Sequence, residues 1–156
     1  AVKHLRESGY THHIERLMVF GNLALTAGIE PQAMMNWMWS SFVDGAEWVM
    51  APNVIGMALY ADGGAMSSKP YASGGAYLNR MGDSCRDCTF DPKKRVGDDA
   101  CPYTTLYWDF LDRHRDVLAS NHRLSLQYGN LNRLTDLEQI RIRAGEVRDR
   151  LRKGNL

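Results

Sequence analysis

Three cysteines, Cys85, Cys88 and Cys101, most constrain what this chain can fold into, because they lie in its least helical stretch. Two residues separate the first pair, so both sulfurs can point to the same side of a tight turn and bind metal. Three thiolates are one fewer than a closed zinc site or an iron–sulfur cluster usually has. The spacing leaves three readings: buried or idle thiols, zinc with a fourth His or Asp ligand, or an iron–sulfur cluster whose fourth cysteine lies before Ala1.

Size and composition favour one folded domain. The chain has 156 residues, of which 44% are hydrophobic, so we expect a single domain over residues 1–156. The formal net charge of +1 neither favours nor excludes nucleic acid as a partner. Lys and Arg outnumber Asp and Glu in residues 111–156, and the reverse holds in residues 1–110. A basic tail of this kind is an indication of a polyanionic partner.

Targeting signals are not evident in the sequence. No run of about 18 apolar residues occurs, so the sequence predicts no membrane span, and no secretory signal is visible. Cysteines without a secretion signal favour a reducing compartment and a metal over disulfides. We therefore expect a cytoplasmic protein. The start at Ala1, within charged and helix-compatible sequence, favours a piece of a longer protein.

Apolar periodicity predicts helices and no strands, so the expected fold class is all-α with two irregular loops. Along the chain, helices are expected over residues 11–28, 31–50, 53–60 and 105–118, with a helical turn or two over 75–81. Thr11 is the expected N-cap of the first helix, Pro52 is expected to end the second, and Val117 is expected to face inward in the helix over 105–118. A capping box at 135–138 is expected to open the last helix. The loops are the Gly/Ser-rich stretch 61–75 and the cysteine stretch.

The segment 31–50 is dense in Met and Trp nearly all round the helix, which predicts burial in a core or contact with an apolar ligand. Trp37, Trp39 and Trp48 are expected in the core by default. Asp44 lies among them, and a carboxylate there is costly unless it is paired. Arg16 on the preceding helix is its natural partner, as an ion pair or in a ligand-binding role.

Two further groups of residues carry candidate chemistry. His12 and His13 are adjacent at a helix start, where a histidine beside Arg16 can donate a proton near neutral pH; two partly exposed polar residues are the simpler reading. Aromatic and cationic side chains also alternate around the Gly/Ser loop, where they can stack bases and neutralise phosphates. A solvated loop is the simpler reading of this set, which comprises Lys69, Tyr71, Tyr77 and Arg80.

Several blocks of sequence, in order, resemble the C-terminal FAD domain of the photolyase/cryptochrome superfamily. The most similar branch is the iron–sulfur bacterial cryptochromes and photolyases, which include prokaryotic (6-4) photolyases. The blocks are 9–18, 42–44, 47–49, 52–57, 61–64, 69–71, 77–81, the cysteines and 106–110. The resemblance implies a helical FAD-binding fold, truncated at its N-terminus, with an irregular cysteine-containing loop.

The resemblance also implies roles for individual residues. His13, with His12 beside it, matches the catalytic histidine that protonates the lesion. The residues matched to the flavin site are Arg16, Asp44, Trp37 and Asn53, of which Trp37 falls where this branch keeps an electron-relay tryptophan. Cys85, Cys88 and Cys101 match three ligands of a 4Fe–4S cluster, with the fourth expected just upstream of Ala1. Lys69, Tyr71, Tyr77 and Arg80 are expected to contact DNA.

The implied function is light-driven repair of UV-induced pyrimidine dimers in DNA, in particular (6-4) photoproducts, by electron transfer from reduced FAD. The activity would belong to a longer parent, so the missing N-terminal part and UV-damaged DNA are the expected partners. This piece alone is expected to be inactive. Two alternatives stay open: a blue-light photoreceptor without repair activity, and a zinc-stapled helical DNA-binding module.

Overall fold

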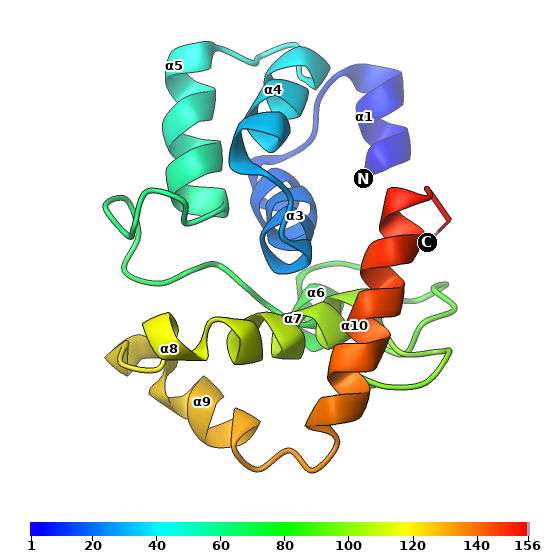
Figure 1. The fold of residues 1–156 in the computed structure, drawn as a ribbon. Helices are drawn as coiled ribbons and strands as arrows, with labels where there is room; N and C mark the ends of the chain where they lie inside the picture. The colour runs from blue at the N-terminus through cyan, green and yellow to red at the C-terminus, as the bar shows by residue number, and fades with distance from the viewer. Residues whose placement is uncertain (156) are drawn as a thin grey trace. The chain divides into compact units, whose positions relative to one another are not determined.

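The chain folds into helices joined by irregular segments, as Figure 1 shows. A computed structural model describes residues 1–155, and within them no strand is formed apart from an isolated bridge between Asp91 and Ala100. The predicted all-α class is therefore confirmed. The backbone divides into two units, Ala1–Ala72 (unit 1) and Ser73–Leu156 (unit 2), which are described separately. The single domain over 1–156 stays a prediction.

Unit 1 contains seven consecutive helical segments, two of which are π-helical. These are α1 (Val2–Ser8), α2 (His13–Glu15), η1 (Arg16–Gly21), α3 (Asn22–Ala27), α4 (Pro31–Ser41), α5 (Glu47–Met50) and η2 (Ala51–Ala58), with η1 and η2 the π-helical ones. α2, η1 and α3 follow one another without a break, and the left-handed Gly28 ends them at φ 77°, as predicted. The N-cap is His12 rather than Thr11, because the His12 imidazole accepts the Ile14 N–H.

The single helix predicted over 31–50 is wrong. α4 begins at Pro31 as expected but ends at Ser41, and a turn follows in which the Gly45 N–H donates to the Phe42 carbonyl at 3.0 Å. A Cβ at Gly45 would lie 2.7 Å from the Trp39 carbonyl oxygen, so this turn has room only for glycine. Pro52 does not end a helix either. The chain passes from α5 into η2 at this point, and Pro52 lies in the first turn of η2, the part of a helix in which proline is tolerated.

Methionines, rather than tryptophans, form much of the core of unit 1. The buried cluster consists of Leu5, Phe20, Ala24, Met34, Met35, Met38, Phe42, Met50, Val54, Ala58 and Leu59. Trp37 is 40% exposed, Trp39 43% and Trp48 80%, so their expected core placement is wrong. α4 has only eleven residues and buries one face, which Met34, Met35 and Met38 occupy, and the indoles fall elsewhere on the helix surface.

The described part of unit 2 contains four α-helices of seven residues or more and two shorter helical segments. They are α6 (Gly75–Met81), α7 (Pro102–Arg113), α8 (Arg115–Leu118), the 3₁₀ segment η3 (His122–Leu124), α9 (Ser125–Leu131) and α10 (Leu137–Arg152). α6 confirms the helical turns predicted over 75–81. The helix predicted over 105–118 starts earlier, because Pro102 takes the first helical position, and it breaks at His114. Val117 is 73% exposed, so its predicted inward position is wrong.

α10 packs along α7 and buries the apolar stripe Ile140, Ala144 and Val147 (Figure 1). The capping box predicted at its start is not formed, because no side chain caps the helix. The Asp136 carboxylate instead accepts a hydrogen bond from Arg95 Nε at 2.7 Å. The helix begins at Leu137, so the N-cap position falls on Asp136 rather than on Thr135, and the Glu138 carboxylate accepts from Arg141 instead of from the backbone.

The cysteine stretch between α6 and α7 is irregular, as predicted, and hydrogen bonds fix it to the first turn of α7, which is also bonded to α6. The Thr104 hydroxyl accepts the Gly75 N–H at 2.9 Å and donates to the Pro92 carbonyl at 2.8 Å. The Thr105 hydroxyl donates to the Arg95 carbonyl at 2.8 Å. Two threonines on the first turn of α7 therefore hold the loop from one side.

None of the helices formed by residues 1–155 is both long enough and apolar enough to cross a lipid bilayer.

Candidate functional site

A pocket in unit 1 gathers several of the residues singled out from the sequence. It has a volume of about 90 Å³ and is lined by His13, Arg16, Leu17, Met38, Val49, Met50, Asn53, Val54 and Ala58. These residues come from the helix of α2 and η1, from α4, and from the helix of α5 and η2. The pocket is mostly apolar, with one histidine, one arginine and one amide at its wall, which is the usual make-up of a site for a small organic group.

The two π-helical segments bring the walls of this pocket together. Gly21 at the end of η1 packs against η2, where a Cβ on Gly21 would lie 2.9 Å from the Cβ of Ala58. Glycine at this position therefore permits the close approach of the two helices. π-helical turns are rare and frequently occur at functional sites.

Arg16 and Asp44 form the ion pair predicted from the sequence. Arg16 Nη2 lies 2.9 Å from each carboxylate oxygen of Asp44 and donates a hydrogen bond to Oδ2. Arg16 Nε donates to the Thr11 carbonyl at 2.9 Å. The Asp44 side chain is 48% exposed and lies in the turn after α4, so the predicted burial of this carboxylate within a helix is wrong.

The two adjacent histidines have different surroundings. His12 Nδ1 accepts the N–H of Ile14 at 3.2 Å and caps the helix, so one ring nitrogen of His12 is committed to the fold. His13 is solvent-exposed and lines the pocket together with Arg16. Of the pair, only His13 lines the pocket.

Asn53 and Trp37, the other residues matched to a cofactor, are placed differently. Asn53 lines the pocket, and its Nδ2 donates to the Val49 carbonyl at 2.8 Å, which leaves its Oδ1 as an acceptor at the wall. Trp37 is not among the lining residues. Its ring makes edge contacts with Phe20 at 5.4 Å and Phe42 at 6.3 Å between ring centroids.

The three cysteines lie in unit 2 and influence one another electrostatically. Burial, followed by the charges of Cys101 and Cys88, raises the pKa of the Cys85 thiol. Cys101 is buried at the start of α7, and a Cβ on Gly75 would lie 2.6 Å from its Sγ. Among residues 1–155, no three His, Cys, Asp or Glu side chains converge closely enough to bind a single metal ion.

The four residues predicted to contact DNA fall in both units. Lys69 and Tyr71 belong to unit 1, where Tyr71 is 38% exposed. Tyr77 and Arg80 belong to α6 of unit 2, and the Arg80 Cζ lies 5.9 Å from the centroid of the Tyr77 ring. Within α6, Tyr77 and Arg80 are therefore in contact.

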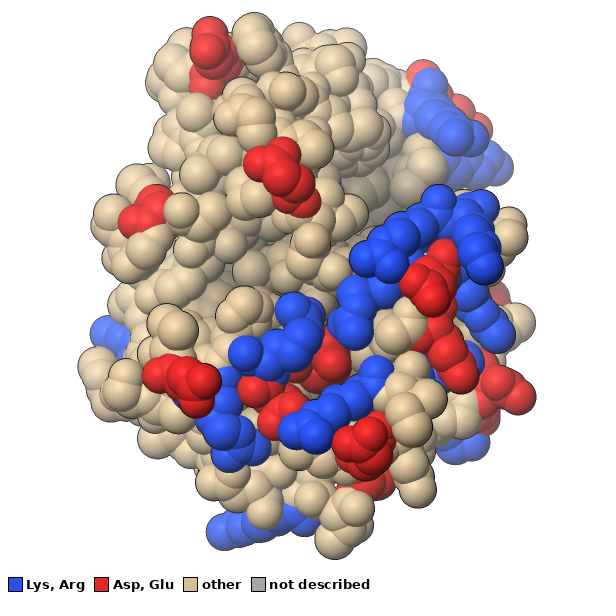
Figure 2. All heavy atoms as spheres, in the orientation of Figure 1, with Lys and Arg blue, Asp and Glu red and all other residues tan. Residues whose placement is uncertain are grey.

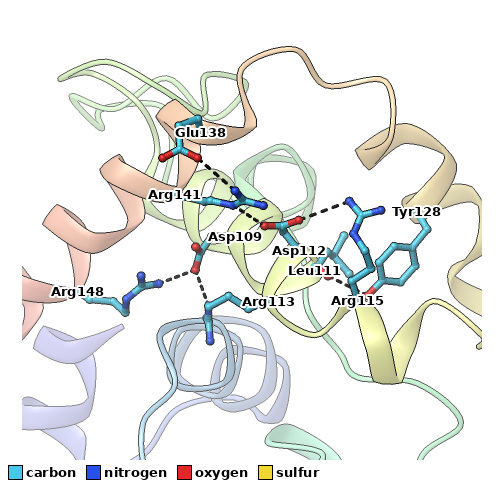
Figure 3. Close-up of polar contacts among 9 residues, drawn as sticks. All are labelled: Asp109, Leu111, Asp112, Arg113, Arg115, Tyr128, Glu138, Arg141 and Arg148. Carbon is cyan, nitrogen blue, oxygen red and sulfur yellow. Dashed lines mark hydrogen bonds and ion pairs between the residues drawn. The ribbon is translucent and has the colours of Figure 1, made fainter.

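The sequence analysis missed a network of ion pairs between α7 and α10, drawn in Figure 3. Asp109 is 2% exposed and accepts from Arg113 and Arg148, while Asp112 pairs with Arg141 and Arg115. The spacing of four residues between Asp109 and Arg113 was the available signal. Figure 2 shows Lys and Arg gathered over α10 and α7 with acidic residues between them. The positive charge of this face is therefore partly neutralised by neighbouring carboxylates, and its arginines are more than a hydrated surface.

Comparison with known proteins relates the chain to DNA photolyases. No protein-family model matches it. The chain is 53% identical over 130 residues to a (6-4) photolyase of Agrobacterium fabrum, a match that covers 83% of this chain and 26% of the relative. It is also 27% identical over 109 residues to an uncharacterized protein of Acanthamoeba polyphaga mimivirus, covering 70% of this chain and 81% of that protein. The chain thus spans about a quarter of the length of its photolyase relative, and it belongs to the photolyase-like family.

Proposed function

We propose that this chain acts, as part of a longer protein, in the light-driven repair of UV-induced pyrimidine dimers in DNA. The lesion we favour is the (6-4) photoproduct, because the 53% identical relative is named a (6-4) photolyase. The observation that carries the proposal is the convergence of His13, Arg16 and Asn53 on one pocket within the matched family.

FAD is the cofactor that this proposal requires, and the pocket residues fit one edge of such a group. Arg16 offers donors, Asn53 Oδ1 offers an acceptor, and Met38, Met50 and Val54 supply an apolar wall. The pocket of about 90 Å³ is smaller than the roughly 300–1,000 Å³ of typical cofactor sites. The rest of the cofactor would contact segments outside this chain. When bound, FAD supplies the light-absorbing, electron-donating ring.

His13 is the residue we assign to proton transfer with the lesion. Its imidazole is solvent-exposed at the pocket wall, and a histidine can gain or lose a proton near neutral pH. His12 keeps Nδ1 on the Ile14 N–H and would support the position of its neighbour. Trp37, which is 40% exposed and contacts Phe20 and Phe42, is proposed as the electron-relay residue.

We further propose that Cys85, Cys88 and Cys101 are three of the four ligands of a 4Fe–4S cluster, with the fourth cysteine in a segment outside this chain. In such a cluster each iron binds a different cysteine, so the sulfurs lie farther apart than the ligands of a single ion. The effect of Cys101 and Cys88 on the pKa of Cys85 supports the proposal, because it requires the three sulfurs to lie in one neighbourhood. Equal molar iron and acid-labile sulfide in the purified protein would support it, whereas zinc without iron would refute it.

DNA binding is proposed for the residues around the Gly/Ser loop and α6, namely Lys69, Tyr71, Tyr77 and Arg80. Arg80 beside the Tyr77 ring is a pairing that can stack on a base and neutralise a phosphate.

The test is a repair assay with the full-length protein that contains this chain. Oligonucleotides carrying a single (6-4) photoproduct or a single cyclobutane dimer are illuminated with the enzyme, and the lesion is quantified. We expect repair of the (6-4) lesion, and loss of about 10²–10⁴ in rate for His13→Ala, the size of a general-acid contribution. His122→Ala, at an exposed position in unit 2, is the matched control. Bound flavin without repair of either lesion would favour a photoreceptor instead.

A further inference from the structure

The guanidinium of Arg16 is held by two acceptors and by two aromatic rings. Its Nε and Nη2 are engaged by Thr11 and Asp44, as described above. Its Cζ lies 4.2 Å from the centroid of the Phe42 ring and 4.9 Å from that of Tyr10. The Arg16 side chain is only 14% exposed, and cation–π contacts strengthen as water is removed. The acceptors fix the direction of the guanidinium, and the rings limit its tilt.

This arrangement leaves one nitrogen of Arg16 for a ligand. Within the described residues Nη1 donates to no protein acceptor, and Arg16 lines the pocket. The charge of Arg16 is already balanced by Asp44, and a phosphate here would repel that carboxylate. A neutral acceptor, such as a carbonyl oxygen or a ring nitrogen, therefore suits Nη1 better than an anion.

Phe42 connects this arginine to the aromatic cluster of unit 1. It is 4% exposed, and its ring makes edge contacts with Phe20 and Trp37, each at 6.3 Å between centroids. Its place in the core therefore prevents the Phe42 ring from moving away from Arg16. Tyr10 is 45% exposed and limits the guanidinium by a second ring contact.

We propose that Phe42 and Tyr10 are positioning residues that hold Arg16 Nη1 as a directed donor to a carbonyl oxygen or ring nitrogen of the flavin. The inference rests on the proposed function for its ligand. The contacts of the Arg16 guanidinium with Phe42 and Tyr10, which we call the clamp, are a property of the protein alone. Phe20 provides a matched control, because it belongs to the same buried cluster but has no contact with the Arg16 guanidinium.

The first experiment examines the clamp without flavin. NMR signals of the Arg16 guanidinium report how fast it rotates about the Cζ–Nε bond. We expect separate Nη signals in the wild-type protein and in Phe20→Leu, and averaged signals in Phe42→Leu. Tyr10→Leu changes a half-exposed position and provides a second variant that preserves the core. Unchanged Arg16 signals in both Phe42→Leu and Tyr10→Leu would overturn the clamp.

The second experiment measures binding of FAD to the full-length protein and the reduction potential of the bound flavin. We expect Phe42→Leu to weaken FAD binding about tenfold, the size of a desolvated cation–π contact, and to lower the potential. Phe42→Tyr, which keeps the ring, should restore both, and Phe20→Leu should change neither. Equal effects of Phe42→Leu and Phe20→Leu would refute the positioning role. A wild-type protein that binds no FAD would refute the proposed function and leave the NMR result standing.

Discussion

Asp109 on α7 and Arg148 on α10 lie 2.5 Å apart between Oδ2 and Nη1, although 39 residues separate them in the sequence. The same oxygen accepts from Arg113 Nε at 2.7 Å, as Figure 3 shows. One buried carboxylate therefore joins the two longest helices of unit 2 and balances two guanidinium groups.

Asp109→Asn should destabilise the protein by about 3 kcal/mol, the lower end for breaking a buried ion pair, because both arginines are partly exposed and can be hydrated. Chemical denaturation measures this change. Asp149→Asn is the control, since the Asp149–Arg152 pair is exposed on both sides and should contribute at most about 1 kcal/mol. Equal effects of the two variants would contradict the role given to Asp109.

Gly21→Ala should destabilise unit 1 by about 1–3 kcal/mol, the usual cost of overpacking, because its methyl group would meet the Cβ of Ala58 at 2.9 Å and the Arg16 carbonyl at 3.2 Å. Gly145→Ala in α10 is the matched control. Apart from the adjacent backbone of α10, nothing lies within 4 Å of its added methyl group, so it should stabilise the helix by about 0.5–1 kcal/mol. If Gly21→Ala left the free energy of unfolding unchanged, η1 and η2 would have to lie farther apart than described.

Thr104→Val should cost about 1–3 kcal/mol, because it leaves the buried Gly75 N–H and the Pro92 carbonyl without a partner. Valine has nearly the same shape as threonine, so packing is preserved. Hydrogen exchange of the Gly75 amide should accelerate in this variant and stay slow in Thr135→Val, where the threonine is exposed. Unchanged exchange at Gly75 would contradict the predicted link between α6 and α7.

Asp62 should make the stability of the protein sensitive to acid. Burial alone would raise the pKa of Asp62, but backbone N–H groups, those of Gly64 and Met66 first, outweigh burial and hold the pKa below its ordinary value of 3.8. A depressed folded-state pKa gives stability that is present above the unfolded pKa and is lost as pH falls through the folded pKa. Between pH 7 and pH 3, Asp62→Asn should therefore lose less stability than the wild type. A larger loss in the variant would contradict this sign.

The sequence predicted a helix over residues 11–28 but gave no indication of the π-helical turns within it. Ile14 at the start of this helix is 37% exposed, whereas Phe20 is 8% exposed and belongs to the core. The π-helical segment η1 accounts for this, because a helix bonded i to i+5 rotates the following side chains away from the positions of an α-helix. Nothing in the local sequence marks this change of period.

The candidate site was predictable in part. Arg16 and Asp44 were paired from the sequence because an isolated carboxylate among tryptophans needs a cation and only a short connection joins the two helices. Tyr10 and Phe42 were not recognised as contacts of Arg16. Whether a ring lies over a guanidinium depends on the angle at which two segments cross, and the apolar periodicity of a sequence does not give that angle. The partners of Asp109 were missed for a related reason, because an arginine-rich stripe is ordinarily a hydrated surface.

The missing side chain of Gly75 limits what can occupy position 75 in any chain with this cysteine loop. Every other amino acid would place a carbon 2.6 Å from Cys101 Sγ, and the thiol would have to swing away to make room. Alanine at position 75 would therefore displace the sulfur of Cys101. Glycine at this position is thus a condition for keeping Cys101 Sγ where it lies at the start of α7.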